Sequence, residues 1–286
     1  MKLYAPSTIK DIKERYGFKL SKSLGQNFLT DKNIIDRIVE SAEIGPDDLV
    51  IEIGPGIGVI TGEAAAVAKK VIAVEIDKNL IPILKETMSE FDNVEIVNRD
   101  ILKTNVNGLI EGCGDSISGV KIIGNLPYYI TTPIIMKLLE DGVKADSITV
   151  MMQKEVADRI KAEPGTKAYG ALSVAVQYYC TVDAVVNVPK EVFVPQPKVD
   201  STVLRLSIRE ETPVTLSDRE AFFRCVKAGF GQRRKTLLNS LMGVEGMTKE
   251  GVRAALEAAG INPSRRAETL DLEEFAMLSN EVYLRL

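Results

Sequence analysis

The strongest constraint on the fold of this chain is a short apolar run that leads through a glycine-rich turn into a helix. The apolar run covers residues 49–53, the turn is GPGIG at residues 54–58, and residues 59–70 have a helical pattern. Strand, glycine turn and helix in this order form the first unit of a doubly wound α/β sheet. The glycines let the backbone approach a ligand closely, and the helix N-terminus offers it free N–H groups. The turn has the spacing G-x-G-x-G and not the dinucleotide spacing G-x-G-x-x-G, so it does not by itself identify the ligand.

Three further predicted strands each end at a polar residue. These residues are Glu75, Asp100 and Asn125, which follow the apolar runs at 71–74, 94–97 and 120–124. Ligands of open α/β sheets bind at the carboxyl ends of the strands, so we expect the three side chains to meet beside the glycine turn. Glu75 stands about 20 residues after the first glycine, where an acidic residue accepts hydrogen bonds from ribose hydroxyls. Asp100 is placed to accept a hydrogen bond from an adenine amino group.

The segment after the glycine turn lacks the positive charge that a phosphate group needs. Residues 54–68 contain neither Lys nor Arg. This favours a nucleoside without phosphates, such as S-adenosylmethionine, over NAD or ATP. The chain also has no His, which removes the usual general base and all His-ligated metals. Methyl transfer from a sulfonium needs neither, because its leaving group is neutral, and the missing His argues against a hydrolase.

The tetrapeptide Asn125-Leu126-Pro127-Tyr128 fits methylation of a nucleobase amine. Such an amine is a poor nucleophile because its lone pair is delocalised into the ring. Two acceptors aimed at the amino hydrogens, the Asn125 side-chain oxygen and the Leu126 carbonyl, would draw the lone pair out of conjugation. Pro127 helps to hold Leu126 extended, and Tyr128 would stack on the base. The alternative is a strand end followed by an ordinary proline turn.

Four motifs, in this order and spacing, resemble those of the ribosomal RNA adenine N6,N6-dimethyltransferase family. They are Ser23-Leu24-Gly25-Gln26-Asn27-Phe28-Leu29, Glu52-Ile53-Gly54-Pro55-Gly56, Asn125-Leu126-Pro127-Tyr128 and Phe193-Val194-Pro195-Gln196-Pro197-Lys198-Val199-Asp200-Ser201. The resemblance implies an α/β fold, the seven-stranded Rossmann-like sheet of S-adenosylmethionine-dependent methyltransferases, with a small all-α C-terminal domain. Within the family, the chain most resembles the members that dimethylate two adjacent adenines near the 3′ end of small-subunit rRNA during ribosome biogenesis.

The resemblance also implies which residues form the site. The residues expected to bind S-adenosylmethionine are Gln26, Asn27, Leu29, Gly54, Gly56, Glu75, Ile76, Asp100, Ile101 and Asn125. The residues expected at the target adenine are Asn125, Leu126, Pro127, Tyr128 and Phe193. The base is expected to lie between the rings of Tyr128 and Phe193. An aromatic residue shortly before Pro195 and Pro197 is also typical of core packing, so a purely structural Phe193 is the alternative.

The net charge of −4 is unusual for an RNA-binding protein, but the basic residues are clustered. One cluster lies in residues 1–24. A second, GQRRK at 231–235, is expected to open a helix, where cations oppose the helix dipole unless RNA phosphates offset them. The residues expected to contact RNA are Lys22, Arg233, Arg234 and Lys235. The alternative is an ordinary solvated surface.

A Glu-Glu-Thr-Pro stretch that ends at Pro213 divides the chain. We expect a catalytic domain with a basic N-terminal arm over 1–212 and a helical RNA-binding domain over 213–286. Residues 1–22 are predicted to be a polar arm. The segments 170–180 and 201–209 are predicted to be strands that pair antiparallel at the edge of the sheet. Helices are predicted at 218–229, 232–242, 248–259 and 271–283.

The remaining composition argues against a metal centre and a membrane span. Cys113, Cys180 and Cys225 form no C-x-x-C pair, so neither a disulfide framework nor a zinc site is predicted. No apolar stretch approaches the ~20 residues that cross a bilayer, and the N-terminus has no apolar signal segment. We therefore expect a cytoplasmic protein without a bound metal, and a monomer whose partner is the rRNA of an assembling small subunit.

Three other functions are weighed against this one. A large-subunit rRNA adenine N6-methylase that confers antibiotic resistance would share the fold, but the motifs at 25–29, 125–128 and 195–201 favour the small-subunit reading. A non-catalytic ribosome assembly or RNA-binding factor is disfavoured by the intact Asn125, Pro127 and Tyr128. An NAD-dependent oxidoreductase is disfavoured by the glycine spacing and by the absence of His.

Overall fold

The computed structural model describes residues 2–17, 25–114 and 116–286, and it divides into two compact units. The first contains the chain up to Ala157 together with Val182–Ile208, and the second contains Asp158–Thr181 together with Arg209–Leu286. The start of the C-terminal part of the second unit lies close to the boundary expected at residue 213. The second unit also takes in 158–181, so the division of the functional domains stays a prediction.

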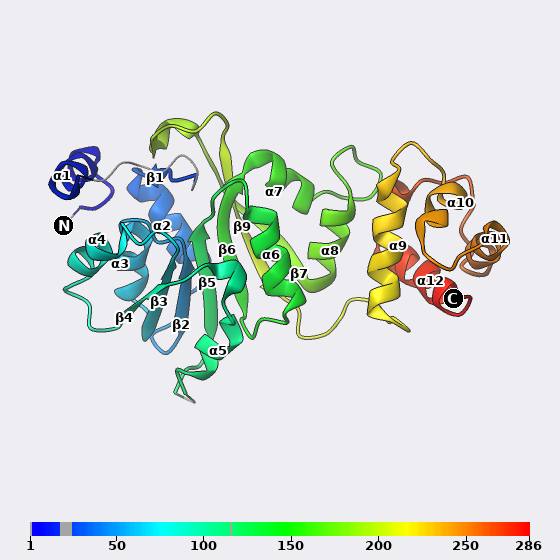
Figure 1. The fold of residues 1–286 in the computed structure, drawn as a ribbon, viewed down its shortest axis with the longest axis horizontal. Helices are drawn as coiled ribbons and strands as arrows, with labels where there is room; N and C mark the ends of the chain where they lie inside the picture. Colours follow the sequence, from blue (N-terminus) through cyan, green and yellow to red (C-terminus); the bar gives the residue numbers. More distant parts are fainter. Residues whose placement is uncertain (1, 18–24, 115) are drawn as a thin grey trace. The chain divides into compact units, whose positions relative to one another are not determined.

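A seven-stranded sheet forms the centre of the first unit, as the family resemblance implied. Its order is β4-β3-β2-β5-β6-β9-β7, which Figure 1 shows from left to right. The strands are β2 (Leu49–Ile53), β3 (Lys70–Glu75), β4 (Val94–Asn98), β5 (Val120–Asn125), β6 (Ser147–Gln153), β7 (Cys180–Val188) and β9 (Ser201–Ile208). The strands from β4 to β6 pair in parallel, and β9 pairs antiparallel with β6.

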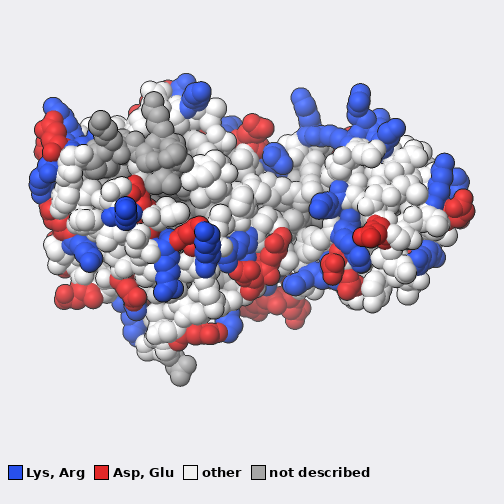
Figure 2. All heavy atoms as spheres, in the orientation of Figure 1, with Lys and Arg blue, Asp and Glu red and all other residues white. Residues whose placement is uncertain are grey.

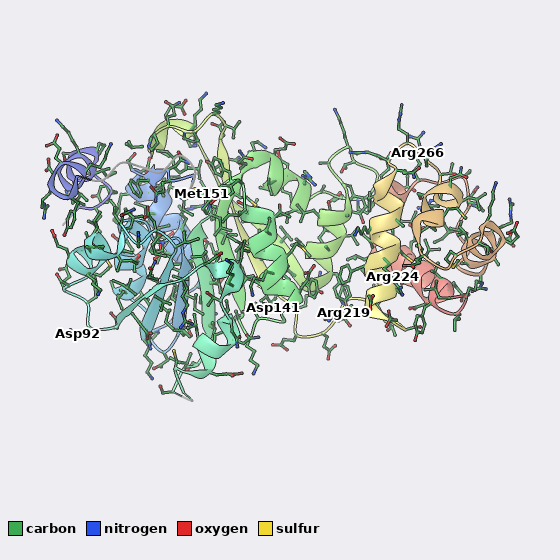
Figure 3. The ribbon with its side chains drawn as sticks, viewed as in Figure 1. Asp92, Asp141, Met151, Arg219, Arg224 and Arg266 are labelled. Carbon is green, nitrogen blue, oxygen red and sulfur yellow. The ribbon has the colours of Figure 1, made fainter. Side chains whose placement is uncertain are left out.

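The central strands are apolar on both faces because helices cover both faces of a parallel sheet. Every residue of β2 is buried, and so are all but the first residue of β3. Val50 on β2 and Met151 on β6 pack in one core with α2 and α3, and Figure 3 labels Met151 in the sheet. The helices of this unit are α1 (Pro6–Tyr16), α2 (Lys32–Ser41), α3 (Val59–Ala65), α4 (Ile81–Thr87), α5 (Val106–Glu111), α6 (Thr131–Glu140) and the start of α7 (Lys154–Ile160).

The N-terminal segment is not the polar arm that its composition predicted. Residues 6–16 form the helix α1, on which Ile9 and Ile12 are buried against Leu80 and Leu84. Two isoleucines three residues apart lie on one helical face, and the surrounding charges hid this short apolar stripe in the sequence. Lys22, expected to contact RNA, lies outside the described residues.

A two-residue ladder joins segments that are far apart in sequence. The strand β1 (Phe28–Leu29) pairs antiparallel with β8 (Phe193–Val194), so that Leu29 faces Phe193. The backbone N–H of Thr30 extends the ladder by donating to the Val192 carbonyl at 2.8 Å. Two of the four motifs therefore lie side by side.

The second unit is helical, with one core of its own. Its helices are α8 (Ala171–Tyr179), α9 (Arg219–Gly231), α10 (Leu237–Ser240), α11 (Lys249–Ala258) and α12 (Leu272–Tyr283). Phe222 on α9 and Phe275 on α12 are fully buried in that core, together with Leu256 on α11. The Asp271 side chain caps α12 by accepting a hydrogen bond from the Glu274 backbone N–H at 2.8 Å.

The strand predicted at 170–180 is wrong, because residues 171–179 form the helix α8. This segment is an almost continuous apolar run, and such a run does not distinguish a buried helix from a buried strand. The Gln177 side chain fixes the helix by donating to the carbonyls of Ile160 and Ala162, both at 2.9 Å. The strand that pairs antiparallel with β6 is β9 alone, and it lies inside the sheet next to the edge strand β7.

Candidate active site

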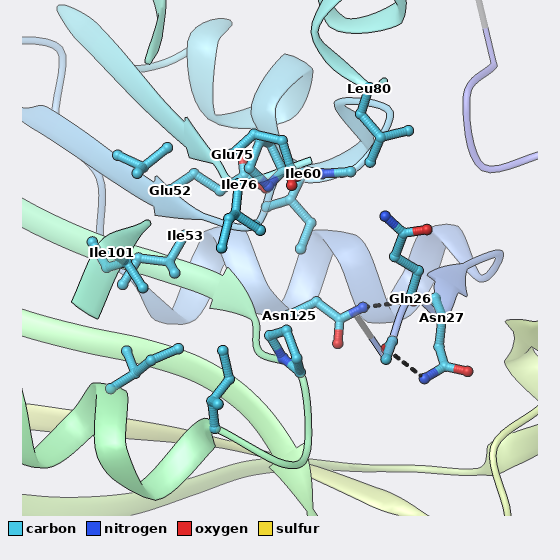
Figure 4. A pocket seen from close by; sticks show the side chains of 18 of the residues that line it. Gln26, Asn27, Glu52, Ile53, Ile60, Glu75, Ile76, Leu80, Ile101 and Asn125 are labelled. Atoms are coloured by element: carbon cyan, nitrogen blue, oxygen red, sulfur yellow. Dashed lines mark hydrogen bonds between the residues drawn. The ribbon is translucent and has the colours of Figure 1, made fainter. Parts of the chain in front are cut away.

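A pocket in the first unit opens at the carboxyl ends of β2, β3 and β5. All ten residues expected to bind the cofactor line it, together with others that include Glu52, Arg99, Pro127 and Tyr129. Figure 4 shows the side chains from these separate segments pointing into one space. The strand ends thus bring together residues that lie almost 100 positions apart in the chain.

The orientation of the Asn125 amide is set by a backbone carbonyl. Its Nδ2 atom donates to the carbonyl oxygen of Asn27 at 2.8 Å, and that oxygen can only accept. The nitrogen must therefore face Asn27, and the amide presents Oδ1 on its other side (Figure 4). The Asn27 side chain in turn donates to the Gly25 carbonyl at 3.0 Å, which holds this segment in its bend.

Glu75 is a buried carboxylate held by backbone donors. Its residue is 5% exposed, and it accepts hydrogen bonds from the N–H groups of Asp77 at 2.8 Å and Gly56 at 3.2 Å. Burial raises the pKa of Glu75 above its usual range, and the two N–H groups oppose that shift. Gln26 closes this side of the pocket by donating from Nε2 to the Asp77 carboxylate at 2.8 Å.

The glycine turn has a backbone that other residues rarely adopt. Gly54 and Gly56 have φ values of +70° and +63°. A Cβ atom on Gly56 would lie 2.9 Å from the Phe28 ring, so there is no room for a side chain. Glycine at position 56 therefore serves both the turn and the packing of the motif at 25–29 against it.

Two aliphatic residues and a carboxylate line another part of the pocket. Ile101 is buried and Ile76 is half exposed, and both line the pocket. The Asp100 carboxylate caps the short turn after β4 through Oδ1, which accepts from the Leu102 N–H at 3.0 Å. Two aliphatic walls beside a carboxylate suit a purine ring that carries an amino donor.

The chemistry of the lining fits S-adenosylmethionine. Three carboxyl groups (Glu52, Glu75 and Asp100) line the pocket, whereas Arg99 is the one cation among the described lining residues and is exposed at the rim. Such a lining accepts hydrogen bonds from hydroxyl and amino groups and attracts positive charge, but it repels phosphate. A nucleoside with a sulfonium centre meets these conditions.

Some of the residues expected at the target base line the pocket, and others have side chains buried in the core. Pro127 lines the pocket with Asn125, whereas Leu126 and Phe193 have buried side chains, 1% and 2% exposed. The Phe193 ring packs in the core of the first unit. The Tyr128 hydroxyl bonds to the Ser201 hydroxyl at 2.6 Å, and burial raises the pKa of Tyr128. Stacking of the base on Tyr128 and Phe193 stays a prediction.

Sequence reasoning missed two residues that shape this pocket. Tyr129 is 57% exposed at the rim, where its ring would lie 3.4 Å from a Cβ on Gly25. Glu52 is 1% exposed at the inner wall. A signal for Glu52 was present, because it is the one charged residue in an otherwise apolar strand.

The basic cluster at 231–235 does not open a helix. Gly231 ends α9, and α10 begins at Leu237, so Arg233, Arg234 and Lys235 lie in the turn between them. The dipole of α9 favours cations beyond its C-terminus, whereas that of the short helix α10 opposes cations before its N-terminus, so the helix dipoles give no separate argument for phosphate contacts. Arg233 forms an ion pair with Glu268 at 3.1 Å and also donates to the Lys167 carbonyl. Arg234 and Lys235 are exposed.

Other basic side chains project from the second unit. Figure 2 shows Lys and Arg on several of its parts in this view, with acidic residues among them. Figure 3 labels Arg219 and Arg224 on α9 and Arg266 on the loop before α12. RNA contact was predicted only for other basic residues, and for Arg233, Arg234 and Lys235 it stays a prediction.

In the described part of the chain, no group of acidic or sulfur side chains could hold a metal ion. The described helices are also too short or too polar for any of them to cross a membrane.

A doubly wound sheet with a nucleoside-type pocket at its strand ends, beside an Asn-Leu-Pro-Tyr turn, defines a methyltransferase that acts on a nucleobase amine. The family model for ribosomal RNA adenine dimethylase matches residues 17–283. The chain therefore belongs to the ribosomal RNA adenine dimethylase family.

Relatives and solved structures agree with this assignment. The chain is 53% identical over 281 residues to "Ribosomal RNA small subunit methyltransferase A" of Clostridioides difficile, covering 98% of this chain and 96% of the relative. It is 54% identical to the protein of the same name in Alkaliphilus metalliredigens, covering 99% of each. A dimethyladenosine transferase from Plasmodium falciparum superposes with a TM-score of 0.74 at 28% identity, covering 87% of this chain and 95% of that one. The 23S rRNA methyltransferase ErmE superposes with a TM-score of 0.67 at 30% identity, covering 89% of this chain and 99% of that one.

Proposed function

We propose that this protein transfers methyl groups from S-adenosylmethionine to the N6 amines of two adjacent adenines near the 3′ end of small-subunit rRNA. The products are N6,N6-dimethyladenosines. The observation that carries the proposal is the fixed amide of Asn125, which presents an acceptor beside a nucleoside pocket. The two relatives compared above are each more than half identical to this chain, and both carry the name of a small-subunit rRNA methyltransferase, which supports the choice of substrate.

The cofactor would be held by residues from three strand ends and from the motif at 25–29. Glu75 would accept hydrogen bonds from the ribose hydroxyls, and Asp100 would accept one from the adenine amino group, with Ile76 and Ile101 against the ring. When bound, S-adenosylmethionine supplies an electrophilic methyl group on a positively charged sulfur. Gly54 and Gly56 keep the turn free of side chains, so that the backbone can approach the ligand.

The target amine would be held by Asn125 Oδ1 and the Leu126 carbonyl. Accepting hydrogen bonds from both amino hydrogens localises the nitrogen lone pair and stabilises the positive charge that develops on N6. The hydrogen bond to Asn27 keeps the Asn125 nitrogen away from the amine, where it would offer a donor instead of an acceptor. The proton that leaves N6 goes to water, which agrees with a chain that has no His.

Tyr128 and Phe193 complete the proposed base site. The bond to Ser201 holds the Tyr128 ring by its hydroxyl, and base–aromatic stacking contributes roughly 1–3 kcal/mol. The Phe193 ring is buried in this structure, so stacking on it requires the ring to turn out of its core cluster. Phe193→Leu separates the two roles, because leucine fills the core but offers no flat face: we expect folding to be kept and base affinity to fall.

The proposal also covers the form of the RNA substrate, the oligomeric state of the enzyme and its location in the cell. We propose that the substrate is the rRNA of an assembling small subunit, that Arg234 and Lys235 contact its phosphates, and that the enzyme acts as a monomer in the cytoplasm. Acidic residues outnumber basic ones in the chain as a whole, which has a net charge of −4, and they would limit binding of RNA to the rest of the surface.

Mass spectrometry of rRNA fragments tests the proposal directly. Unmethylated small subunits are incubated with the protein and S-adenosylmethionine, with Asn125→Ala as the matched control. We expect two adjacent adenines near the 3′ end to gain two methyl groups each with the wild-type protein, and the variant to transfer methyl roughly 10²–10³-fold more slowly. The structural similarity to ErmE makes methylation of large-subunit rRNA the second candidate, so large subunits are assayed in parallel. Methylation of large-subunit rRNA only, or of neither subunit, would overturn the proposal.

A further inference from the structure

Glu52 is a buried acid that the proposed reaction does not use, although it lines the same pocket. It lies in the middle of the sheet on β2, and the other four residues of that strand are apolar. Its carboxyl group accepts a hydrogen bond from the hydroxyl of Thr61 on α3, which is itself fully buried. Among the described residues, no Lys or Arg forms an ion pair with it. Burying an unpaired carboxylate costs several kcal/mol, so this position calls for a neutral acid or a cationic ligand.

A second buried carboxyl lies on the same face of the sheet. Glu52 pairs in register with Ala73 on β3, and Glu75 stands two residues further along that strand. The two acids are therefore diagonal neighbours, and both line the pocket. Neighbouring buried carboxyls do not both ionise readily. Glu75 has two backbone N–H donors that stabilise its charge, whereas the hydrogen bond to Glu52 comes from one hydroxyl, so Glu52 is the acid that keeps the proton.

Within the described parts of the chain, the other charges near β2 do not compensate Glu52. On its other side, β5 places the apolar Ile123 opposite it. On α3, Glu63 lies at the surface and pairs with Lys32 of α2 at 3.2 Å. Arg99 and Asp100 line the pocket farther along, after β4. Burial, with the charge of Glu75 nearby, raises the pKa of Glu52 to about 8, and the Thr61 hydrogen bond opposes that shift.

We infer that Glu52 releases its proton to solvent when a sulfonium cofactor binds in this pocket, and takes a proton up again once the bound sulfur is neutral. The inference rests on the proposed function, which brings a sulfonium into the pocket. The change is one O–H bond broken in Glu52 with the proton passed to water, and the reverse after the methyl group has left. Glu52 is thereby a specificity-determining residue, because its negative charge exists when the ligand is the charged cofactor and disappears for the neutral thioether product.

The number of protons released on binding tests this inference. Isothermal titration calorimetry at pH 7.5, in buffers with different ionisation enthalpies, gives that number for S-adenosylmethionine and for S-adenosylhomocysteine. We expect the sulfonium to release roughly three-quarters of a proton more than the thioether, the fraction of Glu52 that carries a proton at this pH. The sulfonium charge lowers the pKa of the nearby α-amino group in S-adenosylmethionine, so the α-amino group of each free ligand is titrated separately and its proton balance is subtracted.

Variants assign the proton to Glu52. Glu52→Gln should abolish the difference between the two ligands and reduce the preference for the sulfonium by roughly 10- to 100-fold above pH 8.5, where the wild-type carboxyl is charged. Thr61→Val removes the one hydrogen bond to the carboxyl, so the pH range of proton release should move upward. Glu63 is a surface acid on α3, the helix that carries Thr61. Glu63→Gln should therefore leave the number of released protons unchanged.

The possible failures are distinguishable. If both ligands bind wild-type protein and release equal numbers of protons, or if Glu52→Gln keeps the wild-type difference, the inference is wrong while the proposed function stands. If neither ligand binds, the proposed function itself is wrong. If Glu52→Gln does not fold, Thr61→Val still tests the inference. An unchanged pH range of proton release in Thr61→Val would overturn the role of Glu52.

Discussion

The side-chain amide of Asn125 donates to the backbone carbonyl of Asn27, with 2.8 Å between nitrogen and oxygen. The two residues are 98 positions apart, and each belongs to one of the motifs by which the family is recognised. One motif therefore orients the functional group of the other. This contact explains why the segment at 25–29, which precedes the sheet, is part of the site.

Removing the Asn125 amide should affect chemistry more than cofactor binding. Asn125→Ala deletes one of the two proposed acceptors for the target amine, and we expect methyl transfer to slow by roughly 10²–10³-fold. Cofactor affinity should change little, because Glu75 and Asp100 remain. Single-turnover transfer of labelled methyl, beside calorimetric cofactor binding, measures both. Equal losses in the two measurements would mean that Asn125 serves only as a cofactor ligand.

Glu75→Ala should give the opposite pattern. The carboxylate is held by the N–H groups of Gly56 and Asp77 so that its remaining lone pairs face the pocket. We expect affinity for S-adenosylmethionine to fall by roughly 10- to 100-fold, the effect of losing charge-assisted hydrogen bonds. The rate at saturating cofactor should change less. Glu95→Ala, a matched surface acid on β4, should leave affinity unaltered, and normal binding by Glu75→Ala would disprove the ribose assignment.

Much of the site could be predicted from sequence because it follows the strand ends. Parallel strands that are buried on both faces appear as apolar runs, and the residue after each run is easily identified. Glu75 and Asn125 were found in this way, Asp100 lies two residues beyond the partly exposed edge strand β4, and all three line the pocket.

Features set by contacts between distant segments could not be predicted in the same way. The pairing of Leu29 with Phe193 depends on the tertiary fold, and no local periodicity encodes it. The apolar run at 171–179 fits a buried strand as well as a buried helix, and the helix is held by Gln177, which donates to carbonyls of the preceding segment at Ile160 and Ala162. The basic segment at 233–235 was placed at the wrong end of a helix because the boundary lies at Gly231, and helix ends are the least certain part of such a prediction.

Ser201 should position Tyr128 for the target base. Ser201 is fully buried at the start of β9, and its hydroxyl is 2.6 Å from that of Tyr128. Ser201→Ala and Tyr128→Phe each remove this bond, worth about 1 kcal/mol, and we expect each to lower the rate about fivefold. Because they remove the same interaction, the double variant should be no slower than the slower single variant. Additive losses would show that the hydroxyls act separately, and Ser201→Thr should restore the rate if the bond is what matters.

Of the three cations in the turn at 233–235, Arg233 should have a different role from Arg234 and Lys235. Arg234 and Lys235 are exposed, so replacing both with Gln should weaken RNA binding and reduce the slope of log affinity against log salt by roughly 0.7–0.9 per lost phosphate contact. Arg233 is tied to Glu268 and to the Lys167 carbonyl, so Arg233→Gln should mainly lower the thermal stability of the second unit. Filter binding over a range of KCl concentrations, with thermal unfolding as the companion measurement, tests both. An unchanged salt slope in the double variant would contradict a role in RNA binding.

Glu52 should also make the stability of the ligand-free protein depend on pH. Its pKa is about 8 in the folded chain, whereas an unfolded glutamate titrates near 4.3. Between those values the folded state binds more protons than the unfolded state, so stability falls as pH rises, by at most about 1.4 kcal/mol per pH unit. Glu52→Gln lacks this loss. The free energy of unfolding of the variant should therefore rise relative to that of the wild type from pH 5 to pH 8, and the difference should stay constant above about pH 9. Urea unfolding across this range measures the difference, with Glu63→Gln as the control. Curves for Glu52→Gln and wild type that stay parallel throughout would show that Glu52 is ionised in the folded protein at neutral pH, and that the pocket contains a compensating charge.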